Sequence, residues 1–371
     1  MFKYIDHMNG SNILHQRLYN QQVTHQSFQR PAEVVEWFGA MQAQDYHGVK
    51  WAIALRLKGI TDADIEQAIA DKKIVRTWPM RRTLHFVSPE DIRWMLQLLT
   101  PRIISRSATL YRQLELDKKL FSKCKKLFAN ALQGEKQLTR NEIYEILEQA
   151  KISTKAMRGL HILCHLAQEG FICFAARKGK QPTFALLDEW VLPIKPLTND
   201  EALALLTKKY FTSHGPATIN DFAWWSGLTI ADVKRGIEMI KSDLQNEMVN
   251  SQQYWMRNNI VVEKIRPQRI FLLPSFDEYL VAYKDRSLAV HTTHTKNIFG
   301  ANGIFNPVIL VNNKVEGTWK RSFKKNKLQI EINLFSELSK AKKDAVAKAV
   351  KKYSKFTGAP NSFNLIMLSK Q

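Results

Sequence analysis

Cysteine is scarce in this chain, whose 371 residues include only Cys124, Cys164 and Cys173. Three widely spaced cysteines do not form a disulfide framework, and Cys164 and Cys173 lie in apolar runs where core packing is the better interpretation. The chain also lacks a run of 18 apolar residues, and its first ten residues contain no apolar signal core. These absences predict a protein of the reducing cytoplasm without a membrane-spanning helix.

The motifs of several common enzyme classes are missing as well. There is no GxxxxGK[ST] loop, no GxGxxG after a strand, no CxxC pair, and no local signature of a serine or cysteine triad. His291 and His294 form a His-Thr-Thr-His pair, but a pair without a third nearby ligand is weak evidence for a metal. The sequence therefore predicts neither a metal nor a cofactor.

Acidic residues are the other shortage, because 55 lysines and arginines stand against 34 aspartates and glutamates, which gives a formal net charge of +21. From Lys314 onward the imbalance is 14 basic to 4 acidic residues. This excess favours a polyanionic partner, most commonly nucleic acid, over a solvated basic surface with no specific partner. A membrane surface is disfavoured because no isolated basic amphipathic helix stands out.

Apolar residues make up 45% of the chain, enough for a substantial core, and their pattern predicts an α+β fold. A coarse arrangement of helices followed by two short strands occurs three times. Helices are expected at 12–20, 32–41, 48–57, 62–72, 141–150, 155–168, 199–212, 219–226 and 230–242, and hairpin strands at 74–78, 83–87, 171–175, 183–187, 247–250 and 254–256. Helix, turn, helix and hairpin make the winged-helix plan, so we expect three tandem winged-helix units.

Local end signals support several of these elements. Thr61 and Thr229 stand at N-cap positions, and Thr139 begins a stretch with the spacing of a capping box. Gly170 and Gly227 are expected to end the helices that precede them.

The predicted organisation has five segments. Winged-helix units are expected at 1–90, 139–198 and 199–258, and a basic helical connector at 91–138. Residues 259–371 are predicted to form a small β-barrel-like region or a curled sheet, with strands at 260–265, 270–273, 307–311, 314–323 and 327–333 and a terminal helix at 336–353.

The first candidate site is Gln42-Ala-Gln44, which follows an apolar helix. Residues two apart share a face in an extended segment but not in a helix, so a joint site requires non-helical backbone here. The residues from Asp45 to Gly48 fit a helix end or a loop. Two solvated glutamines are the ordinary alternative.

The second candidate site is the first predicted hairpin, where Arg81 and Arg82 form a basic turn ahead of His85. A DNA-contacting wing and a solvated turn fit this pattern equally well. His85 lies in an apolar strand, where a histidine is more often a satisfied core residue. Lys178 and Lys180 occupy the loop of the second predicted hairpin and are candidate DNA contacts.

Together these residues resemble the AlkZ/YcaQ group of winged-helix bacterial DNA glycosylases. The matching segments are MQAQD at 41–45 with WAIALR at 51–56, RRTLH at 81–85, HGPAT at 214–218 with DFAWWSGL at 221–228, and LLPSFDEY at 272–279 with YKDR at 283–286. The resemblance covers roughly residues 12 to 355. It is carried by the order and spacing of the motifs more than by any one of them.

This resemblance implies a monofunctional, cofactor-free enzyme that removes alkylated bases from double-stranded DNA by hydrolysing the N-glycosidic bond. The family motif is Gln-x-Gln or Gln-x-Asp, and Gln42-Ala43-Gln44 matches the AlkZ branch, which is associated with bulky or crosslinked adducts. Gln42 and Gln44 are then the catalytic residues. The motifs also offer site-lining or DNA-contacting candidates, namely Asp45, Arg81, Arg82, His85, Asp277, Tyr279 and Arg286. We expect a monomer that acts at the nucleoid.

The chemistry agrees with that implication. A glutamine amide donates and accepts hydrogen bonds but is no base at neutral pH. An alkylated, cationic purine leaves as a neutral base, so the enzyme needs only to position a water and the sugar. Asp45, next to the motif, is expected to cap a helix or to pair with an arginine. A non-catalytic winged-helix DNA-binding protein or regulator is the main alternative, and an RNA-directed role or another hydrolase also stays open.

Overall fold

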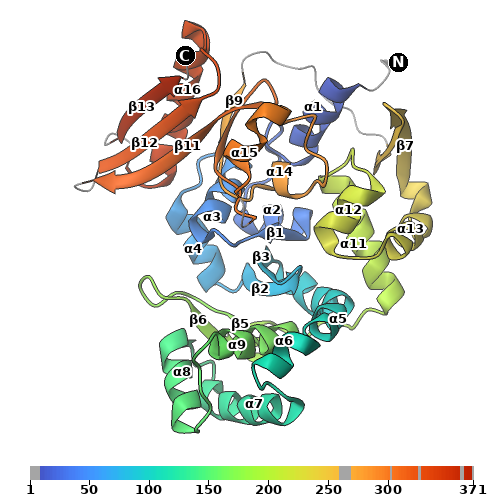
Figure 1. The fold of residues 1–371 in the computed structure, drawn as a ribbon, viewed down its shortest axis with the longest axis vertical. Helices are drawn as coiled ribbons and strands as arrows, with labels where there is room; N and C mark the ends of the chain where they lie inside the picture. Colours follow the sequence, from blue (N-terminus) through green and yellow to red (C-terminus); the bar gives the residue numbers. More distant parts are fainter. Residues whose placement is uncertain (1–8, 259–268, 301–302, 325–326, 360–362, 370–371) are drawn as a thin grey trace. The chain divides into compact units, whose positions relative to one another are not determined.

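The computed structural model describes residues 9–258, 269–300, 303–324, 327–359 and 363–369, and it has a mixed α+β fold. The chain divides into two compact units (Figure 1). Unit 1 comprises Met1–Phe38, Gln44–Ile65 and Thr207–Gln371, and unit 2 comprises Gly39–Ala43 and Glu66–Leu206. The chain therefore leaves unit 2 and enters unit 1 between Ala43 and Gln44.

None of the described helices has both the length and the hydropathy required to cross a bilayer.

Unit 2 is built on a six-stranded sheet in the order β1-β3-β2-β5-β6-β4. Its strands are β1 (Ala40–Gln42), β2 (Val75–Met80), β3 (Thr83–Val87), β4 (Leu138–Thr139), β5 (Ile172–Phe174) and β6 (Thr183–Leu186). All neighbouring strands of this sheet are antiparallel. The helices that lie wholly in this unit are α5 (Pro89–Arg106), α6 (Ala108–Gln113), α7 (Lys118–Leu132), α8 (Arg140–Gln149), α9 (Arg158–Gln168) and α10 (Leu187–Trp190).

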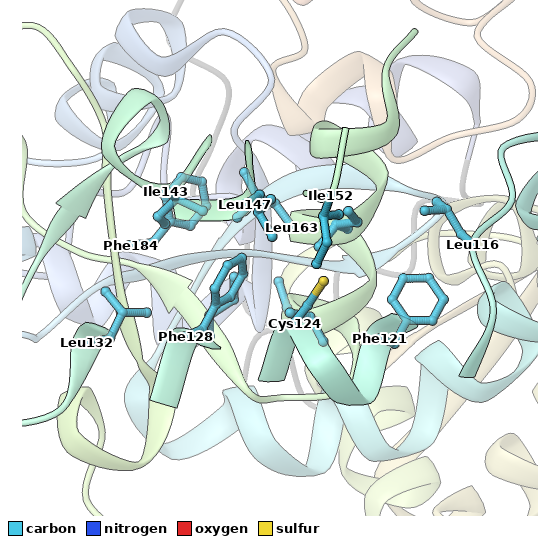
Figure 2. Packing of buried hydrophobic residues seen from close by; sticks show 14 of the residues in the cluster. Leu116, Phe121, Cys124, Phe128, Leu132, Ile143, Leu147, Ile152, Leu163 and Phe184 are labelled. Atoms are coloured by element: carbon cyan, nitrogen blue, oxygen red, sulfur yellow. The ribbon is translucent and has the colours of Figure 1, made fainter. Parts of the chain in front are cut away.

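The core of unit 2 follows from helical spacing. Phe121, Cys124, Phe128 and Leu132 recur along one face of α7 and are all buried. Figure 2 shows them packed with residues of the neighbouring elements, among them Ile143, Leu147, Leu163 and Phe184. Desolvation raises the pKa of the Cys124 thiol to about 11 and that of Cys164 to about 12, so both stay protonated. The described cysteines are all free thiols, and Cys173 is buried, which confirms core packing for this residue.

Several predicted caps are present. Thr139 and Glu142 form a capping box at the start of α8, and Thr61 Oγ1 accepts from the Asp64 backbone N–H at 3.3 Å. Helix α9 begins later than the expected residue 155, because Ala156 and Met157 adopt left-handed backbone angles and delay its first turn. Gly170 follows the helix with φ 71°.

Unit 1 contains α1 (Gly10–Asn20), α2 (Pro31–Phe38), α3 (Tyr46–Leu55), α12 (Ile219–Ser226), α13 (Ile230–Met239), α14 (Glu278–Val281), α15 (Thr295–Ile298) and α16 (Lys340–Phe356). Two helices, α4 (Asp62–Ala70) and α11 (Asn199–Ser213), have residues in both units. Short 3-10 turns occur at Lys241–Asp243 and Thr292–His294. A separate hairpin joins β7 (Leu244–Val249) to β8 (Gln252–Arg257), and Ala217 pairs with Trp255 as an isolated bridge.

The carboxyl-terminal sheet corrects the barrel prediction. It has five strands in the order β13-β12-β11-β10-β9, namely β9 (Ile270–Leu273), β10 (Val308–Val311), β11 (Lys314–Lys324), β12 (Lys327–Leu334) and β13 (Phe363–Ser369). A closed barrel requires its edge strands to pair. Among the described residues β9 and β13 stand at opposite edges, so the sheet is open and the barrel prediction is wrong.

The physical reason for the open sheet is the connection through α16. This helix packs against β9 and returns the chain to the far side of β12, where β13 pairs in parallel (Figure 1). The predicted strand at 260–265 lies outside the described residues, and β13 was not predicted at all.

We expect a pH-dependent stability contribution from Glu169, whose carboxylate is 3.5 Å from His165 Nε2 and 2.9 Å from Lys125 Nζ. The His165 hydrogen bond first, and then Lys125, hold its pKa at about 2, below the ordinary 4.5, although burial acts in the opposite direction. A lowered carboxylate pKa stabilises the fold above pH 4.5, and this contribution is lost as the pH falls toward 2. Between pH 5 and pH 2, the free energy of unfolding measured with urea should therefore fall by about 1–2 kcal/mol more in wild type than in Glu169→Gln. Parallel curves for the two proteins would contradict this assignment.

Candidate functional site

The Gln42-Ala43-Gln44 segment has the non-helical backbone that a joint site requires. The expected helix at 32–41 is too long: α2 ends at Phe38, Gly39 turns the chain with φ 74°, and Ala40–Gln42 form β1. Ala43 follows β1 directly, and its N–H donates to the Leu84 carbonyl of β3 at 2.7 Å. Its own carbonyl accepts from Arg76 Nη2, also at 2.7 Å. The middle residue of the motif is thus held from both sides by unit 2.

The two glutamines differ in exposure. Gln42 is only 6% exposed and lies opposite His85 in the register of β1 and β3. Its Oε1 accepts from Arg81 Nη2 at 3.3 Å, which orients the amide. Gln44 is exposed and lies in a bend just ahead of α3. One amide is therefore fixed within unit 2, and the other is open to solvent.

The β2–β3 turn supplies the arginine that contacts Gln42. Arg81 and Arg82 have φ of 50° and 58°, the left-handed pair of a type I′ hairpin that residues other than glycine and asparagine adopt at some cost. Arg82 is exposed, whereas Arg81 is half-buried. His85 is fully buried, with Nδ1 3.0 Å from the Thr83 carbonyl, as expected of a core histidine. The structure thus brings Gln42, Arg81 and His85 together.

Asp45 both caps a helix and pairs with an arginine, as the sequence indicated. Its carboxylate accepts from the Gly48 N–H at 2.9 Å at the start of α3 and lies 3.7 Å from Arg321 Nη2. Arg321 Nη1 in turn donates to the Tyr353 hydroxyl of α16 at 2.7 Å. Arg321 was not predicted from the sequence. The available signal was its position two residues after the buried Trp319, on the same face of β11.

We expect Asp45→Ala to destabilise the protein by about 1 kcal/mol, because it removes an N-cap hydrogen bond together with a partly exposed ion pair. Asp45→Asn keeps a good N-cap and loses only the charge, so it should cost less than half as much. Urea unfolding midpoints of the two variants measure the difference. Equal losses would mean that the Arg321 pair, rather than the cap, carries the effect of Asp45.

Asp277 and Tyr279, which were predicted to line the site or to contact DNA, lie in the interior of unit 1. Both are 2% exposed. Asp277 accepts from both Arg56 Nη atoms at 3.0 Å and caps α14, and the Tyr279 hydroxyl donates to the Asn313 carbonyl at 2.6 Å. Both side chains therefore belong to the interior of unit 1.

The other predicted residues lie nearer the surface. Arg286 is half-buried, donates to the Leu280 carbonyl at 2.8 Å, and its guanidinium lies 5.0–5.3 Å from the ring centres of Trp224, Phe299 and Phe305. Lys178 and Lys180 are exposed in the loop between β5 and β6, and Lys178 Nζ is 3.2 Å from Glu142. These positions leave both lysines accessible from solvent.

The histidine pair considered as a metal site has other contacts. His294 stacks on Phe335 with ring centres 4.0 Å apart, and the rings of His291 and His294 are 6.0 Å apart. In the part of the chain that the structure describes, no three histidine, cysteine or carboxylate side chains are grouped closely enough to hold a metal ion.

Comparisons with known proteins agree with one another. The model of the family described as DNA glycosylase AlkZ-like matches residues 35–356. An interstrand DNA cross-link repair glycosylase from Streptomyces sahachiroi is 26% identical over 316 residues, which are 78% of this chain and 81% of that protein. The solved structure of the Streptomyces sahachiroi DNA glycosylase AlkZ has a TM-score of 0.81 at 20% identity, covering 97% of this chain and 100% of that one. At this identity the structural likeness concerns the fold.

Proposed function

The chain belongs to the AlkZ-like family of DNA glycosylases, and on that premise we propose that it hydrolyses the N-glycosidic bond of cationic, alkylated purines in duplex DNA. We include interstrand crosslinks among its substrates, since a relative is named for their repair. The observation that carries the proposal is the non-helical Gln42-Ala43-Gln44 segment, whose middle residue is hydrogen-bonded on both sides while Gln44 stays exposed.

The two glutamine amides suit a substrate whose base is already a good leaving group. Alkylation of a ring nitrogen makes the purine cationic, so the bond to the sugar breaks with departure of a neutral base and no general acid is required. The sugar develops oxocarbenium character, and water completes the hydrolysis. Positioning of the water and electrostatic stabilisation of the sugar are the remaining tasks, and amide oxygens can perform both.

We assign different catalytic roles to the two glutamines. The cationic Arg81 holds Gln42 Oε1 at 3.3 Å, and a positive charge beside Gln42 disfavours an oxocarbenium ion there. The same charge favours the hydroxide character that an attacking water acquires. Gln42 is therefore assigned to the water, and the exposed Gln44 to the developing charge on the sugar. His85 and Arg81 support Gln42 from β3 and from the turn that precedes it.

We further propose that the chain contains three winged-helix units, within 1–90, 139–198 and 199–258. The second has the order β4, α8, α9, β5, β6, with β4 paired to β6. The first unit has the order α2, β1, α3, α4, β2, β3, and β1 pairs with β3. In the third unit, the Ala217–Trp255 bridge takes the place of the first strand. Such units hold duplex DNA, with Arg82, Lys178 and Lys180 in their hairpin turns as phosphate contacts.

A direct test incubates the protein with alkylated and with unmodified duplexes and then cuts abasic sites with alkali. Strand breaks that appear only with alkylated DNA and only after alkali support a monofunctional glycosylase. Breaks without alkali would indicate lyase activity, whereas tight binding without breaks would favour the non-catalytic regulator. A crosslinked duplex on a denaturing gel tests unhooking, which should separate the two strands.

A further inference from the structure

A basic hollow of about 500 Å³ lies in unit 1. Four segments line it: the turn after α1, the loop after α3, the start of β9, and α16. Among the described residues, its lining includes the side chains of His25, Lys58, Arg269 and Lys352 and no carboxylate. Helix α16 packs against both β9 and α3 (Figure 1), so the hollow, which we call the basic basin, has a fixed framework.

Two of its cations are poorly compensated. Lys58 and Lys352 have no ion pair with any residue that the structure describes. Within the described part of the chain, the hydrogen bond of Lys352 Nζ is to the Leu55 carbonyl, at 3.4 Å, which also accepts from Gln26 Nε2 at 2.6 Å. Part of the Lys352 side chain is exposed, but burial of its ammonium end lowers the pKa to about 8. A cation that has lost hydration without gaining a carboxylate is stabilised by an incoming anion.

Several other lysines of the protein are paired with carboxylates. His25 also borders a neighbouring hollow of about 610 Å³, where Lys208 lies 2.7 Å from Asp243. Lys50 is 2.7 Å from Asp62, and Lys343 of α16 is 3.2 Å from Glu337. The basic basin differs from these places because it gathers cations from separate segments, with no acidic residue among the described residues that line it.

We propose that the basic basin binds phosphates of the DNA backbone through Lys58, Arg269 and Lys352. The chemistry recognised is a phosphodiester oxyanion, and the source to which we commit is duplex DNA, so the inference rests on the proposed action on DNA. Lysine ammonium groups contact phosphates as point charges and read no base sequence. The basin therefore contributes affinity equally to damaged and undamaged duplexes.

The test measures binding of a fluorescent duplex to Lys58→Ala/Lys352→Ala over a range of salt concentrations. Loss of two phosphate contacts should reduce the slope of log K against log salt by about 2 and lower the affinity on the order of 10-fold at low salt. Alkylated and unmodified duplexes should lose affinity equally. Lys58→Arg/Lys352→Arg should retain wild-type binding.

A matched control is Lys241→Ala/Lys343→Ala, which also removes two positive charges from unit 1. These two lysines are paired with Glu238 and Glu337 at 3.1 Å and 3.2 Å, so their loss should leave the salt slope unchanged. Thermal unfolding checks that each variant is folded, and Lys58→Gln/Lys352→Gln replaces the alanine pair if that variant is unstable.

The inference is overturned if the basin variant binds duplex with wild-type affinity and slope. It is equally overturned if inorganic phosphate binds wild type and not the variant while duplex binding is unchanged, because the basin then takes a free phosphate. Binding of unmodified duplex requires no excision. A loss confined to the basin variant would therefore stand even if the glycosylase chemistry were refuted.

Discussion

Replacing Gln44 by alanine is expected to slow single-turnover excision of 7-methylguanine by about 100-fold to 1,000-fold, the range found when one preorganised polar group is removed from a developing charge. Gln42→Ala is expected to slow excision by up to about 100-fold, since Gln42 positions the water without facing the charge on the sugar. The double variant should be less impaired than the product of the two, because both residues act on one transition state. Duplex binding should stay at the wild-type level in all three variants.

The conservative variant makes this prediction more specific. Gln44→Asp reproduces the Gln-x-Asp form of the motif that the sequence resemblance includes, and a carboxylate favours a cationic sugar more strongly than an amide does. It should keep much of the activity that Gln44→Ala loses. Gln149→Ala is the matched control, since Gln149 is an exposed glutamine at the end of α8. Unchanged rates for both motif variants, with intact DNA binding, would remove Gln42 and Gln44 from the mechanism.

Local signals in the sequence predicted the local features of the fold. The capping box at Thr139, the N-cap at Thr229 and the glycine that ends α12 all depend on residues within a few positions of one another. Strand β1 was missed because three residues, Ala40–Gln42, give too short a pattern beside an apolar helix. Gly39, with φ 74°, carried the signal that the helix ends there.

The features that the sequence could not predict depend on contacts between distant segments. Strand β13 pairs in parallel with β12, and a parallel neighbour needs a crossover that local periodicity does not reveal. The motif at Asp277 gave a family resemblance but not a location, because its partner Arg56 is 221 residues away. Arg81 was predicted as part of a basic turn, yet its hydrogen bond to Gln42 follows only from the pairing of β1 with β3.

The buried ion pair between Arg56 and Asp277 should control the stability of unit 1. Their side chains are 0% and 1% exposed, and two hydrogen bonds of 3.0 Å join them. Arg56 also donates to the Ala52 carbonyl at 2.7 Å and the Gln21 carbonyl at 3.0 Å. Asp277→Ala leaves the guanidinium buried without its carboxylate, which should lower the unfolding free energy by about 3–5 kcal/mol.

Matched variants separate the loss of pairing from the loss of packing. Asp277→Asn keeps an acceptor for Arg56 and the N-cap of α14, so it should cost clearly less than Asp277→Ala. Arg56→Met/Asp277→Leu removes both charges and should regain part of the stability lost by either single truncation, because no unpaired charge stays buried. Glu238→Ala breaks the exposed pair with Lys241 and should change stability by less than about 0.5 kcal/mol. Urea unfolding of the set provides the measurement. If Asp277→Ala costs no more than Glu238→Ala, Arg56 has found other compensation and the pair does not hold unit 1 together.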